Sequence, residues 1–233
     1  KQEDIEGMEK YAKFESYLDE KKINESKELL TAMGIAVVQA PGEGEAQASF
    51  FAQQPDIYAV ASQDYDCLMF KAPKLIQNLS LSRKRKTVSG YVEIGPQIIE
   101  LKEVLKELEI NQEQLICLGI ICGTDYNPGG IKGLGPKKSL KIVKDYITKE
   151  KIFQALKEDE KFKNYNINFD WEIIYKEIIN PNIDKNVKIE FTNIDKNKIK
   201  EILLEYEFSE DRINNQLEKL ENLRKQNQQK TLF

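Results

Sequence analysis

The chain has 233 residues, of which 40% are hydrophobic, and a formal net charge of −4. This length can bury one substantial core, and the acidic balance argues against a uniformly basic nucleic-acid-binding protein. The absence of histidine excludes serine–histidine and cysteine–histidine catalysis and every histidine-bearing metal site. The cysteines form no C-x-x-C pair, and no apolar run approaches the ~20 residues that cross a bilayer, so we expect no zinc site and no membrane partner.

Strand and helix patterns alternate near the start of the chain. Helical spacing of apolar residues predicts a charged helix over 3–33, and a short buried strand follows at 35–38. A helix is expected to begin at Pro41, and a second apolar strand at 57–61. This order predicts a parallel sheet, whose ligands bind at the carboxyl ends of its strands.

The rest of the chain is predicted to be mostly helical. Strands are first expected at 75–81 and 91–94, as a hairpin around a basic run. From Pro96 onward, helices are predicted at 97–108, 112–122, 136–147, 150–157, 171–179, 195–205 and 209–226.

Three short stretches hold five carboxylates. The stretches are Pro-Gly-Glu-Gly-Glu at 41–45, Ser-Gln-Asp-Tyr-Asp at 62–66 and Gly-Thr-Asp-Tyr at 123–126, and the acids are Glu43, Glu45, Asp64, Asp66 and Asp125. Each stretch lies at the end of a predicted buried element. Clustered acids repel one another unless a cation lies among them, and Mg²⁺ prefers carboxylate oxygens and water as ligands. Together the stretches predict a magnesium site.

Each stretch has a simpler interpretation when it is taken alone. The helix dipole favours acids in a first turn, which accounts for Glu43 and Glu45 without a metal. Asp64 and Asp66 can be turn residues, or the Asp-x-Asp of a glycosyltransferase or of a phosphatase with an aspartyl nucleophile. Asp125 can simply end a helix. Only the conjunction of the three stretches favours the metal site.

A glycine-rich basic segment, Gly-Gly-Ile-Lys-Gly-Leu-Gly-Pro-Lys-Lys, occupies 129–138. It is not a P-loop, because Pro136 stands where lysine is required and no strand precedes it. It lies instead between two predicted helices, where Gly133 and Gly135 let the backbone approach a phosphate and the second helix offers its N-terminus. The lysines that follow on that helix are Lys137, Lys138, Lys141 and Lys144. The pattern predicts a helical hairpin that binds the nucleic-acid backbone without reading sequence.

Together, these motifs resemble the internal region of flap endonucleases, the archaeal type in particular. The resemblance runs from about residue 20 to residue 150 and more loosely beyond. It implies an α/β fold: a PIN-like nuclease core, in which a parallel sheet is flanked by helices, a helix-two-turn-helix DNA-binding element at about 112–147 and a helical C-terminal part. It also implies a magnesium-dependent endonuclease that cleaves 5′ flaps of branched double-stranded DNA in replication and repair, and it leaves room for 5′–3′ exonuclease activity.

The resemblance assigns roles to single residues. Glu43 would help to hold one Mg²⁺, and the second Mg²⁺ would be held by Glu45, Asp64, Asp66 and Asp125. Gly123, with Glu43 and Asp125, would lie beside the scissile strand. The hairpin residues expected to bind duplex DNA, with K⁺ on its backbone carbonyls, are Lys132, Gly133, Gly135, Lys137 and Lys138.

The resemblance also implies how the chain is organised. Family members begin with a segment that supplies further metal-binding aspartates and has no counterpart here, so we expect a fragment. Residues 1–33 would be the end of a helical arch and a connecting helix, and 34–227 the C-terminal part of the nuclease core. Residues 228–233 resemble the start of a sliding-clamp-binding tail, with Gln229, Leu232 and Phe233 as contacts. The expected location is cytoplasmic, at the nucleoid.

Two other interpretations stay open. The isolated fragment could be a DNA-junction binding module without catalysis. An Asp-x-Asp glycosyltransferase is the other alternative, but it leaves the lysine-rich hairpin unexplained.

Overall fold

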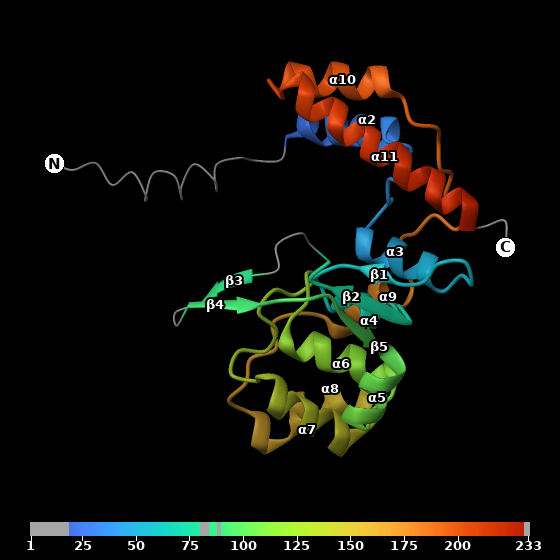
Figure 1. Ribbon diagram of the computed structural model, residues 1–233. Coiled ribbons are helices and arrows are strands. Elements are labelled where there is room, and N and C mark those ends of the chain that lie inside the picture. Colours follow the sequence, from blue (N-terminus) through green and yellow to red (C-terminus); the bar gives the residue numbers. More distant parts are fainter. Residues whose placement is uncertain (1–18, 80–83, 88–89, 231–233) are drawn as a thin grey trace. The chain divides into compact units, whose positions relative to one another are not determined.

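The computed structural model describes residues 19–79, 84–87 and 90–230 (Figure 1). Two compact units are present: residues 39–185 form the larger, and the described residues of 1–38 and 186–233 form the smaller. Within the described residues, no helix is long and apolar enough to span a membrane. Of the expected clamp-binding residues, Leu232 and Phe233 lie outside the described part, and Gln229 falls near the end of the last helix.

The smaller unit consists of three helices around a small apolar core. They are α2 (Glu20–Ala32), α10 (Lys196–Glu205) and α11 (Glu210–Lys230). Their buried contacts are Ala32, Ile199, Ile213 and Leu217. Asp19 and Asp195 begin two of these helices by accepting backbone N–H groups, as N-cap aspartates do. The predicted helix over 3–33 is observed from Glu20 to Ala32, and its residues 3–18 lie outside the described part.

The sheet of the larger unit is mixed. It contains β1 (Val60–Ala61), β2 (Lys74–Gln77) and β5 (Gln97–Glu100), in the order β1-β2-β5. β1 runs parallel to β2, with Val60 opposite Leu75, whereas β2 and β5 are antiparallel, with Leu75 opposite Ile99. The expected parallel pairing is observed between β1 and β2, and β5 adds an antiparallel strand that was not predicted.

Two local predictions also differ from the structure. The segment 97–108 begins as β5 and becomes helical only at α5 (Leu101–Leu108), because its first four residues pair with β2. Residues 35–38 form no strand, and Ile35 and Val37 are 41% and 37% exposed. A strand exists only where a neighbour accepts its backbone hydrogen bonds, and no strand in the described residues pairs with this segment.

The basic run forms part of a separate two-stranded ladder. β3 (Lys84–Thr87) pairs antiparallel with β4 (Gly90–Glu93), with Arg85 opposite Val92. A hairpin was expected here, but the basic residues belong to one of its strands rather than to the connection between strands. The expected first strand pairs with β5 instead.

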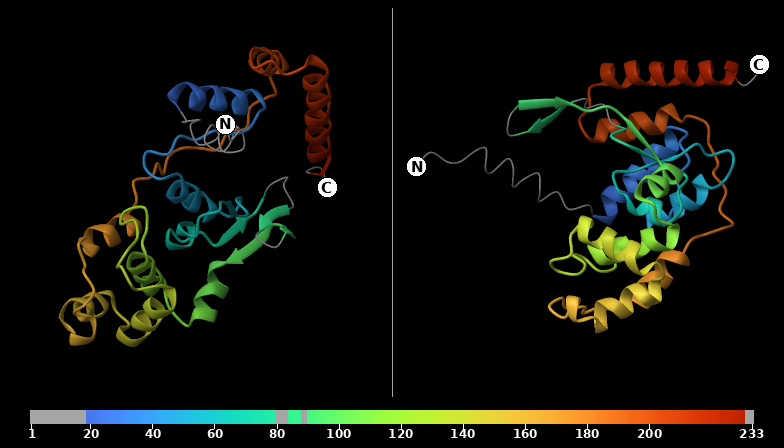
Figure 2. Two further views of the ribbon diagram at one scale, coloured as in Figure 1. Left: turned by 90° about the vertical axis from the view of Figure 1, so that its left-hand side faces the viewer. Right: turned by 90° about the horizontal axis from the view of Figure 1, so that it is seen from below.

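The main core of the larger unit is built around α6 (Gln112–Cys122), whose residues 115–122 are all apolar. The other helices of this unit, besides α5, are α3 (Gly44–Ala52), α4 (Asp66–Met69), α7 (Pro136–Tyr146), α8 (Lys149–Glu158) and α9 (Trp171–Ile179), with a 3₁₀ turn η1 (Glu160–Phe162). Ile116, Cys117, Ile120 and Ile121 of α6 are buried in the main core. A helix that is hydrophobic all round must be covered on every side. α6, α7 and α8 accordingly lie side by side (Figures 1 and 2).

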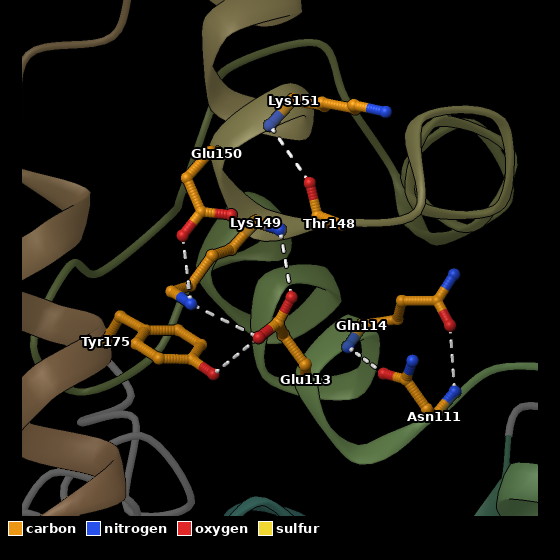
Figure 3. A network of polar contacts seen from close by, with 8 residues as sticks. All are labelled: Asn111, Glu113, Gln114, Thr148, Lys149, Glu150, Lys151 and Tyr175. Atoms are coloured by element: carbon orange, nitrogen blue, oxygen red, sulfur yellow. Dashed lines mark hydrogen bonds and ion pairs between the residues drawn. The ribbon is translucent and has the colours of Figure 1, made fainter.

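A polar network fixes the starts of α6 and α8 to α9 (Figure 3). The Glu113 carboxylate accepts the backbone N–H of Lys149 at 3.1 Å and the Lys149 ammonium at 3.2 Å. The Tyr175 hydroxyl donates to the same carboxylate at 3.4 Å. These side chains are partly buried, so the pairing is less screened than a surface ion pair. The network therefore joins α6, the helix that precedes the hairpin, to α8 and α9.

Candidate functional site

The five predicted acids lie at the ends of secondary-structure elements. Glu43 is the N-cap of α3, and Glu45 lies in its first turn. Asp64 follows β1, and Asp66 is the first residue of α4. Asp125 lies in the loop that follows α6, two residues beyond its C-cap Gly123. The short helix α4 was not predicted, and it determines where Asp66 lies.

The turn between β1 and α4 is held by its own side chains. The Asp64 carboxylate accepts the backbone N–H of Asp66 at 2.8 Å. Ser62 Oγ accepts the backbone N–H of Asp64 at 3.1 Å and donates to the Glu45 carboxylate at 3.4 Å. Ser62 therefore links Asp64 of the turn to Glu45 of α3 by hydrogen bonds. Sequence reasoning missed this role, although a serine two residues before an aspartate is a common turn signal.

Neighbouring acids raise the pKa values of Glu43 and Asp66. Burial raises the pKa of Glu43, and Asp125, Glu45 and Asp64 raise it further, against a hydrogen bond from the Tyr126 hydroxyl that lowers it. The acids that raise the pKa of Glu43 come from all three stretches, so the structure brings the three stretches together.

Asp66 shows the strongest effect of this crowding. Burial, together with the charges of Asp64, Asp125 and Glu43, raises the pKa of Asp66 to about 7. Within the described residues, no lysine or arginine forms an ion pair with any of the five acids. The repulsion is left uncompensated by protein cations.

This donor set fits a hard cation. All five side chains offer carboxylate oxygens; Glu43, Glu45, Asp64 and Asp66 are half-buried, and Asp125 is exposed. Among the described residues, no three acids or cysteines already close into a direct ligand shell. Mg²⁺ keeps several of its waters when carboxylates bind it, so a loose ring of acids suits it better than a closed cage. The predicted residues are thus assembled, but not in direct ligand geometry.

The loop after α6 is folded back onto that helix by a buried asparagine. Asn127 Nδ2 donates to the Ile120 carbonyl at 2.7 Å, and its Oδ1 accepts the Thr124 hydroxyl at 2.7 Å. The Thr124 hydroxyl oxygen in turn accepts the backbone N–H of Tyr126 at 3.2 Å. These bonds fix Asp125 and Tyr126 between two anchored residues. The sequence contained no comparable signal for Asn127.

Glycines allow the same loop to pass close to the end of α6. Gly123 has φ +112°, and a Cβ there would lie 2.7 Å from the backbone nitrogen of Gly130. Gly130 has φ +54°, and a Cβ there would lie 2.3 Å from the carbonyl oxygen of Ile121. The loop can adopt this path only with glycine at both positions.

We expect Gly130→Ala to destabilise the hairpin strongly. Left-handed strain and the backbone clash together should lower the free energy of unfolding by about 3 kcal/mol and the Tm by roughly 10 °C. Gly129→Ala is the matched control, since φ is +83° there but a Cβ would meet nothing within 4 Å. Thermal unfolding followed by circular dichroism gives both values. Equal decreases in Tm for Gly130→Ala and Gly129→Ala would contradict the explanation that the close backbone contact at Gly130 requires glycine.

The hairpin presents most of its predicted DNA-binding residues to solvent. The exposed ones are Lys132, Gly133, Gly135, Lys137 and Lys138. Gly135 is the N-cap of α7, and Pro136 occupies the first helical position, as predicted. Lys144 differs, because its ammonium forms an ion pair with Glu109 at 2.7 Å. The ion pair argues against its expected place among the lysines that approach the nucleic acid, which stays a prediction.

Comparison with known proteins places the chain in a family. The family model described as XPG I-region matches residues 34–125. Flap endonuclease 1 of Staphylothermus marinus is 44% identical over 220 residues, which cover 93% of this chain and 61% of that protein. Flap endonuclease 1 of Thermococcus onnurineus is 45% identical over 98% of this chain and 65% of its own length. The chain belongs to the flap endonuclease family.

Solved structures of relatives share the fold. Flap endonuclease-1 from Methanococcus jannaschii matches with a TM-score of 0.74 at 37% identity, over 96% of this chain and 64% of that one. The catalytic core of Rad2 in complex with DNA substrate matches with a TM-score of 0.71 at 20% identity, over 89% of this chain and 72% of that one. The expected family and the α/β nuclease fold class are confirmed. The chain spans about three-fifths of the length of the curated relatives.

Proposed function

We propose that the protein acts as a magnesium-dependent, structure-specific endonuclease that cleaves 5′ flaps of branched DNA. The observation that carries this proposal is that the acid cluster and the lysine-rich hairpin are joined by one loop. Asp125 belongs to the uncompensated acid cluster, and the chain continues from it directly into the exposed lysine-rich hairpin. A hard-cation site beside a backbone-binding element is what phosphodiester hydrolysis requires.

The hairpin residues bind DNA, and the acids hold the cations that cleavage requires. The hairpin lysines Lys132, Lys137 and Lys138 bind phosphates of the duplex, and Gly133 and Gly135 let those phosphates approach the backbone. The acids hold the cations, with Glu43 assigned to one and Glu45, Asp64, Asp66 and Asp125 to the other. When bound, the cations lower the pKa of the attacking water and stabilise the leaving oxygen.

The side chains around the acids orient them. Ser62 donates a hydrogen bond to the Glu45 carboxylate and accepts one from the backbone N–H of Asp64. It therefore fixes the position of the Asp64 turn relative to Glu45 on α3. The Tyr126 hydroxyl donates to Glu43, and burial together with that carboxylate raises the pKa of Tyr126 to about 12. Tyr126 therefore stays protonated and remains a donor near neutral pH.

Finer assignments rest on the family likeness alone. They are K⁺ on the hairpin carbonyls, a sliding clamp bound through Gln229, Leu232 and Phe233, a cytoplasmic location at the nucleoid, and a role in replication and repair. A 5′–3′ exonuclease activity belongs to the same group.

The test is cleavage of an end-labelled 5′-flap duplex in Mg²⁺ and in EDTA, with a flapless duplex and single-stranded DNA of the same sequence as controls. We expect cleavage near the junction only for the flap, only with the cation. Flap binding without cleavage would favour the second candidate, a DNA-junction binding module. That candidate has a specific support, since no three acids or cysteines among the described residues close into a direct ligand shell. Equal cleavage of all three substrates would contradict structure specificity.

A further inference from the structure

Tyr165 lies against the hairpin although it comes from outside it. It follows the 3₁₀ turn η1, and no sequence motif singled it out. A Cβ built on Gly133 would lie 3.2 Å from Cε1 of the Tyr165 ring, so the ring lies beside this glycine, which is still exposed to solvent. The Lys138 ammonium donates to the Tyr165 hydroxyl at 3.5 Å and to the Gly133 carbonyl at the same distance. Tyr165 thus contacts two residues of the phosphate-binding hairpin.

Both partners of the Lys138 ammonium are electrically neutral. Within the described residues, no acid forms an ion pair with Lys138, whereas Lys144 on the same helix is paired with Glu109. Neutral acceptors direct an ammonium without cancelling its charge, so Lys138 keeps its full attraction for a phosphate. A lysine side chain otherwise loses up to about 2 kcal/mol of rotamer entropy when it is immobilised.

Tyr165 is itself held in place by aromatic packing. Its ring lies 6.3 Å from the ring of Phe162, which lies 6.3 Å from the ring of Tyr146 in the last turn of α7. The Tyr146 hydroxyl donates to Asp159 at 3.0 Å. The backbone N–H of Tyr165 donates to the Phe162 carbonyl at 2.8 Å. The segment 159–165 is therefore attached to both ends of α7, and its tyrosine is a fixed support rather than a loose side chain.

We propose that Tyr165 is a positioning residue that holds the Lys138 ammonium in place for a DNA phosphate. The inference rests on the proposed function, because it assumes that the hairpin binds the duplex backbone. It extends the binding element beyond the hairpin motif to a residue that lies 27 positions further along the chain.

The test uses a substitution that changes no charge. Tyr165→Phe keeps the ring on Gly133 and removes only the hydroxyl. Duplex affinity is measured by fluorescence anisotropy at several salt concentrations. We expect affinity at low salt to fall about fivefold and the slope of log affinity against log salt to become shallower, by less than the roughly 0.9 that loss of the whole phosphate contact would give. A substitution that merely loosened the fold would leave this slope unchanged.

A double variant separates positioning from an independent contact. If Tyr165 acts through Lys138, Tyr165→Phe should have no further effect on the slope in a Lys138→Ala background. Lys144→Ala is the control for a lysine on the same helix that is already paired, and it should leave the slope unchanged. An unaltered slope in Tyr165→Phe, or additive effects in the double variant, would overturn the proposal.

A measurement without DNA distinguishes this inference from the proposed function. Lysine side-chain NMR of the free protein should show greater mobility of the Lys138 ammonium in Tyr165→Phe, with Lys137 unaffected. If the unmodified protein showed no salt-dependent duplex binding, the proposed function would fail, yet this NMR comparison would still decide the positioning role. Unchanged Lys138 mobility would refute it.

Discussion

Asp64→Asn combined with Asp66→Asn should abolish cation-dependent cleavage while making the metal-free fold more stable. A cation held by Asp64 and Asp66 would lower the activation free energy of cleavage by several kcal/mol. We therefore expect the cleavage rate to fall by roughly a thousandfold or more. The stabilising effect follows from crowding, since burial and neighbouring acids raise the pKa of Asp66 to about 7. After allowance for solvent screening, relief of this repulsion should be worth about 1 kcal/mol, a Tm increase of roughly 2–4 °C.

The opposite directions of the two effects make this prediction specific. The measurements are flap cleavage in Mg²⁺ and thermal unfolding in EDTA and in Mg²⁺. The cation should raise the Tm of the unmodified protein and leave that of the double variant unchanged, because only the former binds it. Asp56→Asn, which removes an exposed carboxylate beyond the opposite end of α3, should change neither activity nor the response to Mg²⁺. A double variant that cleaves normally would refute the assignment of these acids.

The parts of the site that the sequence could predict are those determined by local spacing. Glu43 and Glu45, like Asp64 and Asp66, sit two residues apart at element ends, and such positions follow from capping and strand-end rules. The start of α7 could be predicted for the same reason, since Pro136 suits the first helical position and Gly135 the N-cap. These capping and strand-end rules act between residues close together in the chain, so the sequence alone was sufficient to predict these positions.

The remaining features depend on partners that lie far away in the chain. Residues 97–100 read as part of a helix, yet they form a strand because β2 offers them an open edge. Lys144 looked available for DNA until the structure placed Glu109 beside it, 35 residues earlier in the chain. Ser62 reaches Glu45 across 17 residues. Periodicity contains no information about such pairs, so they appear only when the fold is known.

Lys137→Ala combined with Lys138→Ala should weaken duplex binding for all sequences alike. Both side chains are exposed at the start of α7, and neither forms an ion pair within the described residues. A charge-assisted contact is worth about 1.5 kcal/mol at the low end, so each lysine should account for roughly tenfold in affinity at low salt. Because each lost phosphate contact removes about 0.9 from the salt slope, the double variant should lose about 1.8.

The structure supplies a strict comparison for this experiment on the same helix. Lys144→Ala also removes one positive charge from α7, but that charge is already compensated by Glu109, whose pKa the Lys144 ammonium lowers. If binding responded only to the net charge of the hairpin, Lys144→Ala would shift the slope as much as either single variant. If it depends on ammonium groups free to meet phosphates, only Lys137 and Lys138 matter, and duplexes of unrelated sequence respond equally. A loss confined to some sequences would contradict a backbone-binding role and would require contacts with base edges, for which the hairpin offers no structural evidence among its described residues.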